Sequence, residues 1–396
     1  MKICVISPVV IPVLGLKQKY GGIENVISIA CEEMVKRGHE VYLFASGDSK
    51  TSAQLIPTTK KALGQGISFE AEKACNALGY KLAIQQKPDV IWDHTLAIHA
   101  QIMRKNNSKY IFKADIALDK NSLIDTNGIP VVQTLHGPAK DHIPKLVHDL
   151  SVAGHFFVSI SKDQARRFLD YIHNNQHLGT VYNAVDINFF HPSGDKKTKD
   201  YLFWVGRYCM EKGPHIALEV AHRIDMPIYF IGKKVEKHEI DYFKKFVEPN
   251  MKPQDKIIGE VSADIKAEYF RNAKATMMTN LWPEPFGIVA AESMASGTPV
   301  VGPAYGSLTE LIDNAGLLIN IDDIELDEND IEVSKNQERY IDLIAKNMKK
   351  IDDIPTMLPR KRAEFLFSPE HNTVGYEEAF TKAAYLINNP KNTPIK

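Results

Sequence analysis

The sequence predicts an α/β protein made of two doubly wound parallel sheets. Short apolar runs of strand length alternate with amphipathic helical patterns along most of the chain. This alternation stops in the polar segment HPSGDKKTKD (residues 191–200) and then begins again. A chain of 396 residues is too long for one ordinary domain and sufficient for two. We therefore expect two Rossmann-like halves joined by a linker at residues 191–200.

The first half shows the βαβ rhythm from its start. The apolar run KICVIS (residues 2–7) predicts a buried strand, and a helix is expected after the glycine pair Gly21 and Gly22. Apolar residues of this helix recur at i, i+3, i+4, i+7 and i+11, and Gly38 marks its end. Further strands are predicted at residues 40–45, 88–94, 130–136 and 155–161.

The second half repeats the rhythm. Strands are predicted at residues 201–206, 227–232, 256–261, 275–279 and 298–302, and helices from Pro214, from about Ala263 and from Gly287. A last helix carries an apolar stripe from Tyr376 to Ile387, which must dock on another surface. The expected domains are residues 1–190 and 201–370, followed by this helix in residues 371–396.

The composition is that of a globular protein and argues against several classes of function. A net charge of −1 argues against a dedicated nucleic-acid binder. The four cysteines are scattered, which indicates reduced thiols in a cytosolic protein. The apolar start contains Pro8 and Pro12 and indicates a strand rather than a signal peptide. No run approaches the roughly 20 apolar residues of a membrane span. We expect a cytoplasmic protein whose membrane contact, if it has any, is peripheral.

The most informative stretch is EPFGIVAAESMASGTPVV (residues 284–301). Flanking prolines keep Glu284 out of a helix, which can begin at about Phe286 or Gly287. Free N–H groups at that helix start form an anion site suited to a diphosphate. Glu292 falls roughly 8 Å along the helix, where a carboxylate suits a ribose diol. The glutamate spacing alone is a weak signal, because a surface glutamate and a helix glutamate also produce it.

The surrounding segments strengthen this signal. The stretch resembles the E-x7-E signature of retaining glycosyltransferases of family 4, which have the GT-B fold. Other segments resemble further motifs of that family: YGGIE (20–24), the hinge strand VYNAVDINFFHP (181–192), the phosphate loop WVGRYCMEKGP (204–214), IIGEV (257–261) and YGSLTEL (305–311). The resemblance covers nearly the whole chain. It implies two Rossmann-like domains that face a central cleft, with the last helix packed back on the N-terminal domain.

The resemblance also implies residue roles in both halves. The residues expected to act on the transferred group are His136, Arg207, Lys212 and Glu284. The residues expected to bind the donor are Gly21, Gly22, Arg207, Lys212, Glu260, Val261, Glu284, Phe286, Gly287, Ile288, Val289 and Glu292.

Each role follows from the chemistry of the family. Arg207 and Lys212 would neutralise the diphosphate, which gains negative charge as the glycosidic bond breaks. Glu292 would bind the ribose hydroxyls, Glu284 a hydroxyl of the transferred sugar, and His136 another part of that sugar. The base would lie beside Glu260 and Val261, and the phosphates beside Gly21, Gly22 and the N–H groups of Gly287, Ile288 and Val289.

The mechanism expected from these residues uses neither a metal ion nor another cofactor, because no Asp-x-Asp motif follows a strand. Retention is expected through front-face substitution, in which the departing phosphate takes the proton of the acceptor. UDP-glucose is the expected donor, because it is a frequent donor in the family that the sequence resembles. The acceptor stays open between a small molecule, a glycan and a lipid, and so does the oligomeric state.

Other interpretations also stay open. A sugar-nucleotide epimerase, a phosphorylase or a catalytically silent sugar-nucleotide-binding protein would share the donor site. A nicotinamide-dependent oxidoreductase would need G-x-G-x-x-G after a strand, and Gly64-Gln65-Gly66 lacks the third glycine. His94, at a predicted strand end, and Arg166, after a predicted helix start at Ser161, have no assigned role.

Overall fold

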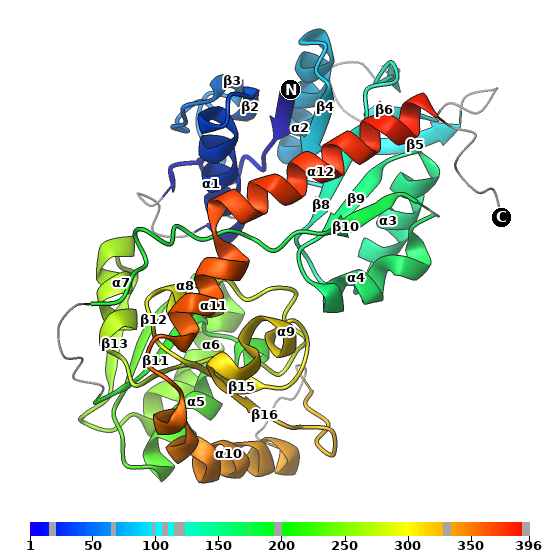
Figure 1. Ribbon diagram of the computed structural model, residues 1–396. Helices are drawn as coiled ribbons and strands as arrows, with labels where there is room; N and C mark the ends of the chain where they lie inside the picture. The colour runs from blue at the N-terminus through cyan, green and yellow to red at the C-terminus, as the bar shows by residue number, and fades with distance from the viewer. Residues whose placement is uncertain are drawn as a thin grey trace. The chain divides into compact units, whose positions relative to one another are not determined.

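The computed structural model describes residues 1–15, 21–64, 69–96, 100–104, 110–114, 123–173, 175–193, 200–327 and 334–389. The chain forms two compact units (Figure 1). Unit 1 comprises residues 1–184 and 369–396, and unit 2 comprises residues 185–368. The predicted linker at residues 191–200 falls in unit 2, and its residues 194–199 lie outside the described part.

Unit 1 is built on a seven-stranded parallel sheet. Its strands are β1 (Lys2–Ile6), β2 (Glu40–Ser46), β3 (Gln54–Thr59), β4 (Val90–Asp93), β8 (Val131–Leu135), β9 (Phe156–Ser159) and β10 (His177–Thr180). They lie in the order β10-β9-β8-β4-β1-β2-β3, and all neighbours are parallel. The order reverses at β1, which is the mark of a doubly wound sheet.

Helices cover both faces of this sheet. They are α1 (Gly22–Lys36), α2 (Phe69–Gln85), α3 (Ile143–Val152), α4 (Lys162–Phe168) and α12 (Pro369–Asn388). Ile3 and Val5 of β1 lie in one core with residues of α1 and α12. Cys4 and Ile6 lie in a second core with residues of α2, α3 and α4. Successive side chains of a strand point to opposite faces, so this division confirms the predicted doubly wound half.

Unit 2 is built on a six-stranded parallel sheet. Its strands are β11 (Leu202–Arg207), β12 (Ile228–Lys233), β13 (Lys256–Gly259), β14 (Ala275–Met277), β15 (Val300–Pro303) and β16 (Leu317–Ile319). Its helices include α5 (Pro214–Arg223), α6 (Lys237–Tyr242), α7 (Ala263–Asn272), α8 (Ile288–Ala295), α9 (Leu308–Ile312), α10 (Lys335–Asn347) and α11 (Leu358–Phe367). The order β13-β12-β11-β14-β15-β16 is the Rossmann order. The second predicted half is therefore confirmed as well.

One local prediction was wrong, and another was displaced by one residue. Residues 181–192 were expected to contain a strand, but β10 ends at Thr180. The N–H of Val181 still donates a hydrogen bond to the carbonyl at the end of β9, and beyond Val181 the chain leaves the sheet. The helix after Glu284 was expected from about Phe286 or Gly287. Gly287 is its N-cap, with a left-handed φ of 91°, and the helix itself begins at Ile288.

A small antiparallel sheet was not predicted at all. It consists of β5 (Ala100–Arg104), β6 (Tyr110–Ala114) and β7 (Leu123–Ile124). It lies in the chain between β4 and β8, two strands that pair directly in the parallel sheet. The antiparallel sheet is therefore an insertion in the doubly wound pattern.

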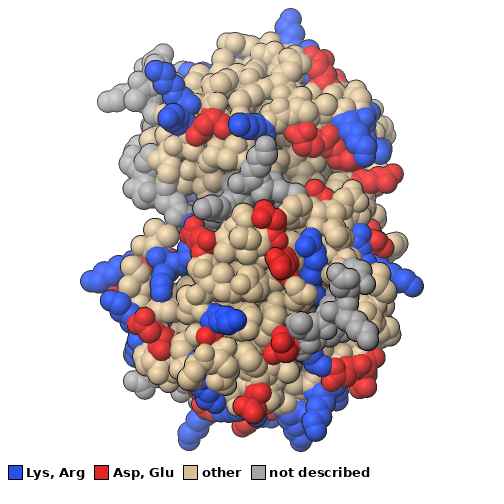
Figure 2. Space-filling model, turned by 90° about the vertical axis from the view of Figure 1, so that its left-hand side faces the viewer, with Lys and Arg blue, Asp and Glu red and all other residues tan. Residues whose placement is uncertain are grey.

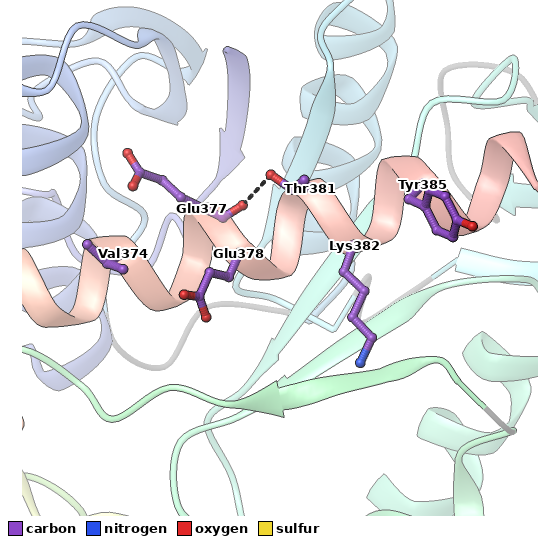
Figure 3. A pocket seen from close by; sticks show the side chains of 6 residues that line it. All are labelled: Val374, Glu377, Glu378, Thr381, Lys382 and Tyr385. Atoms are coloured by element: carbon purple, nitrogen blue, oxygen red, sulfur yellow. Dashed lines mark hydrogen bonds between the residues drawn. The ribbon is translucent and has the colours of Figure 1, made fainter.

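The last helix, α12, docks inside unit 1. In Figure 1 it is drawn in red, and it packs on α1, β8 and β10. Its Tyr376 ring lies 4.3 Å from the Trp92 ring, measured between centroids. The Tyr376 hydroxyl hydrogen-bonds to the Thr134 hydroxyl (3.1 Å), which accepts a hydrogen bond from Trp92 Nε1 (2.8 Å). The outer side of α12 lines a shallow pocket with Val374, Glu377, Glu378, Thr381, Lys382 and Tyr385 (Figure 3).

Glu377 joins α12 to the end of α1 and the start of β2. Its carboxylate accepts hydrogen bonds from Arg37 (2.9 and 2.8 Å) and from His39 Nε2 (2.6 Å). The Arg37 guanidinium, helped by His39, lowers the pKa of Glu377 from 4.5 to about 2 against the opposing effect of burial. A carboxyl with a lowered pKa stabilises the folded state above its unfolded pKa, and this contribution is lost as the pH falls from 4.5 to about 2.

We expect Glu377→Gln to destabilise unit 1 at pH 7 by about 1–2 kcal/mol, a value reduced for partial exposure of the pair. Hydrogen exchange of the α12 amides at pH 7, together with urea unfolding of the protein between pH 7 and 2.5, would measure this loss of stability. The deficit should shrink below pH 4.5. Exposed Glu378 supplies the control, since Glu378→Gln should change little. A deficit that does not depend on pH would show that packing, and not the charge, is responsible.

The surface shows no large field of one sign on the face drawn. Lys and Arg side chains are interspersed with Asp and Glu side chains in Figure 2. Within the described residues, no helix has both the length and the apolar character that a bilayer crossing requires.

Candidate active site

The strand order of unit 2 brings two predicted motifs together. The order reverses at β11, whose neighbour on the reversing side is β14. The carboxyl end of β11 carries Arg207 and, one short turn later, Lys212. The carboxyl end of β14 leads to Glu284 and then into α8. Ligands of open α/β sheets bind outside the carboxyl ends of the strands at such a reversal, so this is the candidate site.

The two loops are bonded to each other. Gly213 has a φ of 58°, and a Cβ at this position would collide with the Thr279 carbonyl. The Thr279 hydroxyl donates to the Gly213 carbonyl (2.7 Å), and the N–H of Leu281 donates to the Glu211 carbonyl (2.9 Å). Trp204 Nε1 donates to the Lys212 carbonyl (3.4 Å). The backbone that carries Lys212 is therefore fixed relative to the loop that carries Glu284.

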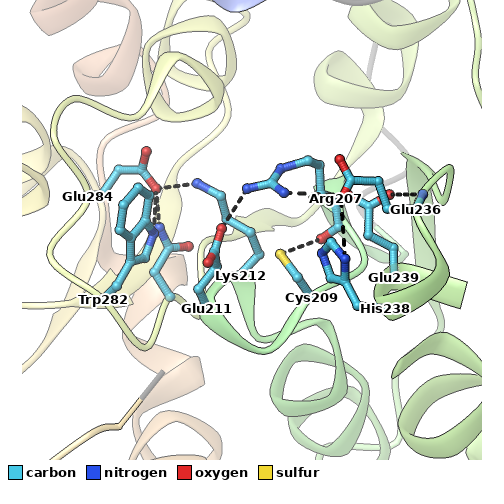
Figure 4. A network of polar contacts seen from close by, with 10 residues as sticks. Arg207, Cys209, Glu211, Lys212, Glu236, His238, Glu239, Trp282 and Glu284 are labelled. Atoms are coloured by element: carbon cyan, nitrogen blue, oxygen red, sulfur yellow. Dashed lines mark hydrogen bonds and ion pairs between the residues drawn. The ribbon is translucent and has the colours of Figure 1, made fainter. Parts of the chain in front are cut away.

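Glu284 receives three donors on one oxygen. Lys212 Nζ lies 2.6 Å and Trp282 Nε1 3.2 Å from its Oε2, and Asn280 Nδ2 also donates to that atom. Figure 4 shows the side chains of Lys212 and Trp282 beside the Glu284 carboxylate. Lys212 Nζ also lies 4.8 Å from the centroid of the Trp282 ring, a cation–π contact. The other oxygen, Oε1, makes none of the described hydrogen bonds, so it can accept one from a ligand.

The backbone of Glu284 is held by the loop that follows β15. The N–H of Ser307 donates to the Glu284 carbonyl (3.1 Å), and the Ser307 hydroxyl donates to the Phe286 carbonyl (2.7 Å). Gly306 has a φ of 62°, and a Cβ there would lie 2.8 Å from the Glu284 nitrogen. A glycine is therefore required for this close approach, which fixes the position of the glutamate.

Glu292 is buried in the second turn of α8, with 5 % exposure. Lys266 Nζ, from α7, lies 2.7 and 2.8 Å from its two carboxylate oxygens. A carboxylate has about four lone-pair directions, so the ion pair with Lys266 leaves acceptor capacity on both oxygens. That capacity matches a diol. Sequence reasoning did not single out Lys266.

Arg207 is held by two glutamates. Its Nη2 lies 2.6 Å from Glu211 Oε1, and its Nη1 lies 3.4 Å from Glu239 Oε1 (Figure 4). Burial alone would raise the pKa of Glu239. The N–H groups of Val235 and Glu236, together with Arg207, nevertheless lower this pKa below its usual value. Glu239 is thus ionised and orients the guanidinium.

Cys209 lies in the same loop as Arg207, and burial raises the pKa of its thiol to about 12. A thiol with such a pKa stays protonated near neutral pH and is a poor nucleophile. Among the described residues no group of three or more His, Cys, Asp and Glu side chains has a metal-binding arrangement.

In unit 1 the strand order reverses between β1 and β4, and His136 lies beside His94 next to this reversal. These residues follow the neighbouring strands β8 and β4. His94 Nδ1 and His136 Nε2 lie 2.8 Å apart. Burial lowers the pKa of His136 to about 4, and burial and the neighbouring His136 lower that of His94. Both rings are therefore neutral near pH 7.

Gly21 and Gly22 stand at the start of α1, where no side chain caps the helix. Gly21 has a φ of 139°, and among the described residues a Cβ at Gly22 would meet nothing within 4 Å. Arg166 is 74 % exposed and lies 3.7 Å from Asp163, so it faces solvent in the described part of the chain.

The remaining predicted donor residues lie around α8 and α7. The Phe286 side chain is buried against Phe367 with ring centroids 5.6 Å apart, so it belongs to the core of unit 2. Ile288 and Val289 form the first turn of α8, which no side chain caps. Two further residues, Glu260 and Val261, lie in the loop between β13 and α7.

Sequence reasoning missed three side chains that hold the predicted glutamates: Lys266, Asn280 and Trp282. Asn280 and Trp282 carry side-chain N–H donors and lie close to Glu284 in the sequence, and that proximity was a usable signal. Lys266 is 26 residues from Glu292 and gave no such signal. It contacts Glu292 because α7 and α8 pack side by side.

Comparison with solved structures defines the class of fold. Sucrose-phosphate synthase from Thermosynechococcus elongatus aligns with a TM-score of 0.71 and 14 % identity over 96 % of this chain and 98 % of that chain. Anabaena Alr3699/HepE in complex with UDP and glucose aligns with a TM-score of 0.66 and 18 % identity over 96 % and 99 %. The two parallel sheets, together with these neighbours, define the GT-B fold and confirm the predicted fold class.

Comparison of sequences defines the family. The family model described as Glycosyltransferase Family 4 matches residues 20–189, and that described as Glycosyl transferases group 1 matches residues 186–350. The chain belongs to this family of glycosyltransferases, as the sequence motifs predicted.

Curated relatives match only parts of the chain. Uncharacterized glycosyltransferase MJ1178 of Methanocaldococcus jannaschii is 27 % identical over 210 residues, 50 % of this chain and 54 % of that protein. D-inositol 3-phosphate glycosyltransferase of Pseudarthrobacter chlorophenolicus is 24 % identical over 228 residues, 49 % and 54 %. The chain thus matches about half the length of these relatives.

Proposed function

We propose that this protein transfers a hexose, with retention of anomeric configuration, from a nucleoside diphosphate sugar to an acceptor. UDP-glucose is the proposed donor. The observation that carries the proposal is the arrangement of Glu284: its Oε2 is occupied by Lys212, Asn280 and Trp282, and its Oε1 makes no hydrogen bond to the described residues. A fixed carboxylate with one open oxygen, next to a lysine and a helix start, suits a sugar hydroxyl attached to a diphosphate. The complex of Anabaena HepE with UDP-glucose supports the choice of probe.

Donor binding on unit 2 would use charges that are already present as ion pairs. Lys212 would move from Glu284 to the diphosphate, which frees the carboxylate for the sugar. Glu292 would keep Lys266 and accept the ribose hydroxyls on its remaining lone pairs. Arg207 would contribute charge beside the diphosphate while Glu239 keeps it oriented. The start of α8, at Gly287, Ile288 and Val289, would supply backbone N–H groups.

The proposed chemistry is front-face substitution. After Lys212 moves to the diphosphate, Glu284 would still accept hydrogen bonds from Asn280 and Trp282, which lower its nucleophilicity and favour a role in sugar binding. The departing phosphate would take the proton of the acceptor hydroxyl as the new C–O bond forms and the C–O bond to phosphate breaks. Lys212 and Arg207 would stabilise the charge that develops on the phosphate. Gly21, Gly22 and His136 would contribute to donor binding from unit 1.

A panel of nucleoside diphosphate sugars tests the function. Each would be incubated with the protein, with and without candidate acceptors, and release of nucleoside diphosphate would be measured. Slow release with one donor, accelerated by an acceptor and yielding a retained glycoside, is the expected result. Binding without release under all conditions would favour a silent binding protein, and interconversion of the sugar would favour an epimerase.

Activity is expected to survive excess EDTA. The lysine, the arginine and the start of α8 supply positive charge to the diphosphate without a metal ion. The rate of nucleotide release would be compared in EDTA, in Mg²⁺ and in Mn²⁺, with changes of less than about 2-fold expected. Loss of activity in EDTA and recovery with either cation would contradict the proposed mechanism.

A further inference from the structure

His94 and His136 meet edge to edge. The distance between His94 Nδ1 and His136 Nε2 is 2.8 Å, and the rings are within 22° of parallel with centroids 5.1 Å apart. This centroid distance equals the N···N distance plus the distance from each ring centre to its own nitrogen. The two nitrogens therefore point at each other in the plane of the rings, and one ring donates a hydrogen bond to the other.

The environment of His94 indicates which ring is the donor. His94 is 3 % exposed, and its second nitrogen, Nε2, is buried without a hydrogen-bond partner among the described residues. If His136 were the donor, neutral His94 would carry its proton on Nε2 as a buried N–H without a partner. If His94 is the donor, Nε2 carries only a lone pair. Buried N–H groups without a partner are rarer in proteins than buried acceptors without one, so the second arrangement is favoured.

The described surroundings favour neutral rings. Burial lowers the pKa of both, and the neighbouring His136 lowers that of His94 further. The Trp92 ring lies on another side of His94, with centroids 4.5 Å apart and planes inclined by 48°. Both histidines are thus neutral, and each carries one proton.

We propose that His94 holds His136 in the tautomer protonated on Nδ1, so that His136 meets the donor sugar as a neutral hydrogen-bond donor. This assignment rests on the proposed function for its consequence, because the sugar is the proposed partner of His136. His136 Nε2 is occupied by His94 and cannot serve as a base for the acceptor hydroxyl. His94 is a positioning residue: it acts on the sugar only through His136.

Nitrogen NMR of the protein without donor tests the tautomer directly. The protein would be labelled with ¹⁵N-histidine, and the His94 and His136 signals would be assigned with His94→Asn and His136→Gln variants. At pH 7 both rings should carry the proton on Nδ1, which is the less common tautomer of free histidine. A proton on Nε2 of His136 would overturn the proposal, whatever reaction the protein catalyses.

Two variants of His94 test the consequence. His94→Asn places an amide donor near the original Nδ1 and should keep the His136 tautomer and the transfer rate. His94→Phe keeps a ring beside Trp92 but removes the donor, so the tautomer should change. Its kcat/KM for UDP-glucose should fall by roughly 3- to 10-fold, the factor supplied by one hydrogen bond between neutral groups.

The affinity for free UDP, which is proposed to bind unit 2, should stay the same in both variants and serves as the control. Equal losses of transfer in His94→Asn and His94→Phe, with the His136 tautomer unchanged in both, would overturn the positioning role. A change of tautomer in His94→Phe without any change of transfer would also overturn it. If the wild-type protein transfers no sugar, the proposed function fails, and the NMR result still decides the tautomer.

Discussion

Glu284→Ala is expected to lower kcat/KM for the nucleotide sugar by about 10- to 150-fold, the loss of one hydrogen bond to a charged group. The affinity for the free nucleoside diphosphate should stay the same or increase slightly. Removal of the carboxylate takes the open Oε1 away from the sugar, but it also releases Lys212 from its 2.6 Å ion pair. A released Lys212 can bind the diphosphate without first breaking that pair. Steady-state kinetics and calorimetry with the free nucleotide would measure the two effects separately.

A matched control for this variant is Glu268→Ala. Glu268 is an exposed glutamate on α7 of the same unit, so its removal should change neither kinetics nor nucleotide affinity. Trp282→Phe adds a second comparison, because it removes one donor to Oε2 and retains an aromatic ring under Lys212. It should act in the same direction as Glu284→Ala but less strongly. Equal losses of affinity for nucleotide and nucleotide sugar in Glu284→Ala would show that Glu284 does not bind the sugar.

Much of the fold could be predicted because its signals are local. The buried parallel strands read as short apolar runs, and Pro214 and Gly287 mark helix starts where their backbone conformations require them. The strands of the parallel sheets that were missed give weak local signals. β3 contains Pro57 and is half exposed, β10 contains Gly179 with a φ of 145°, and β16 has three residues. These strands form because a neighbouring strand offers hydrogen bonds.

The site could be predicted only as far as its motifs extend. Lys212 and Glu284 are 72 residues apart, and His94 and His136 are 42 residues apart. Each was visible as a residue, but the contact between the two depends on which strands are neighbours. The strand order of each sheet supplies this information. Sequence reasoning therefore named the residues and left open how they pair, including the contact of His94 with His136.

The pairing found in unit 2 has a physical reason. Lys212 with Glu284 and Lys266 with Glu292 are partly or fully buried ion pairs, and a buried charge without a partner is costly. Each pair is thus neutral without a ligand. At the proposed site a charged donor would bind by replacing or extending these contacts, which would make unit 2 selective for ligands that bring their own charges and hydroxyls. The Glu292 pair differs from the other, because both of its oxygens keep acceptor capacity while Lys266 stays in place.

Glu292→Ala is therefore expected to weaken binding of the free nucleoside diphosphate, as well as of the nucleotide sugar, by about 10- to 150-fold. The variant removes the proposed ribose acceptor and leaves Lys266 without its 2.7 and 2.8 Å contacts. Because Lys266 can cause part of the loss, calorimetry would also use the 2′-deoxy nucleotide. The wild-type protein should bind this analogue less tightly than the ribonucleotide, since the site then lacks a hydroxyl for its carboxylate. In Glu292→Ala the difference between the two nucleotides should disappear, while in Lys266→Met it should persist. If Glu292→Ala still discriminates between them as well as the wild type, another group binds the ribose.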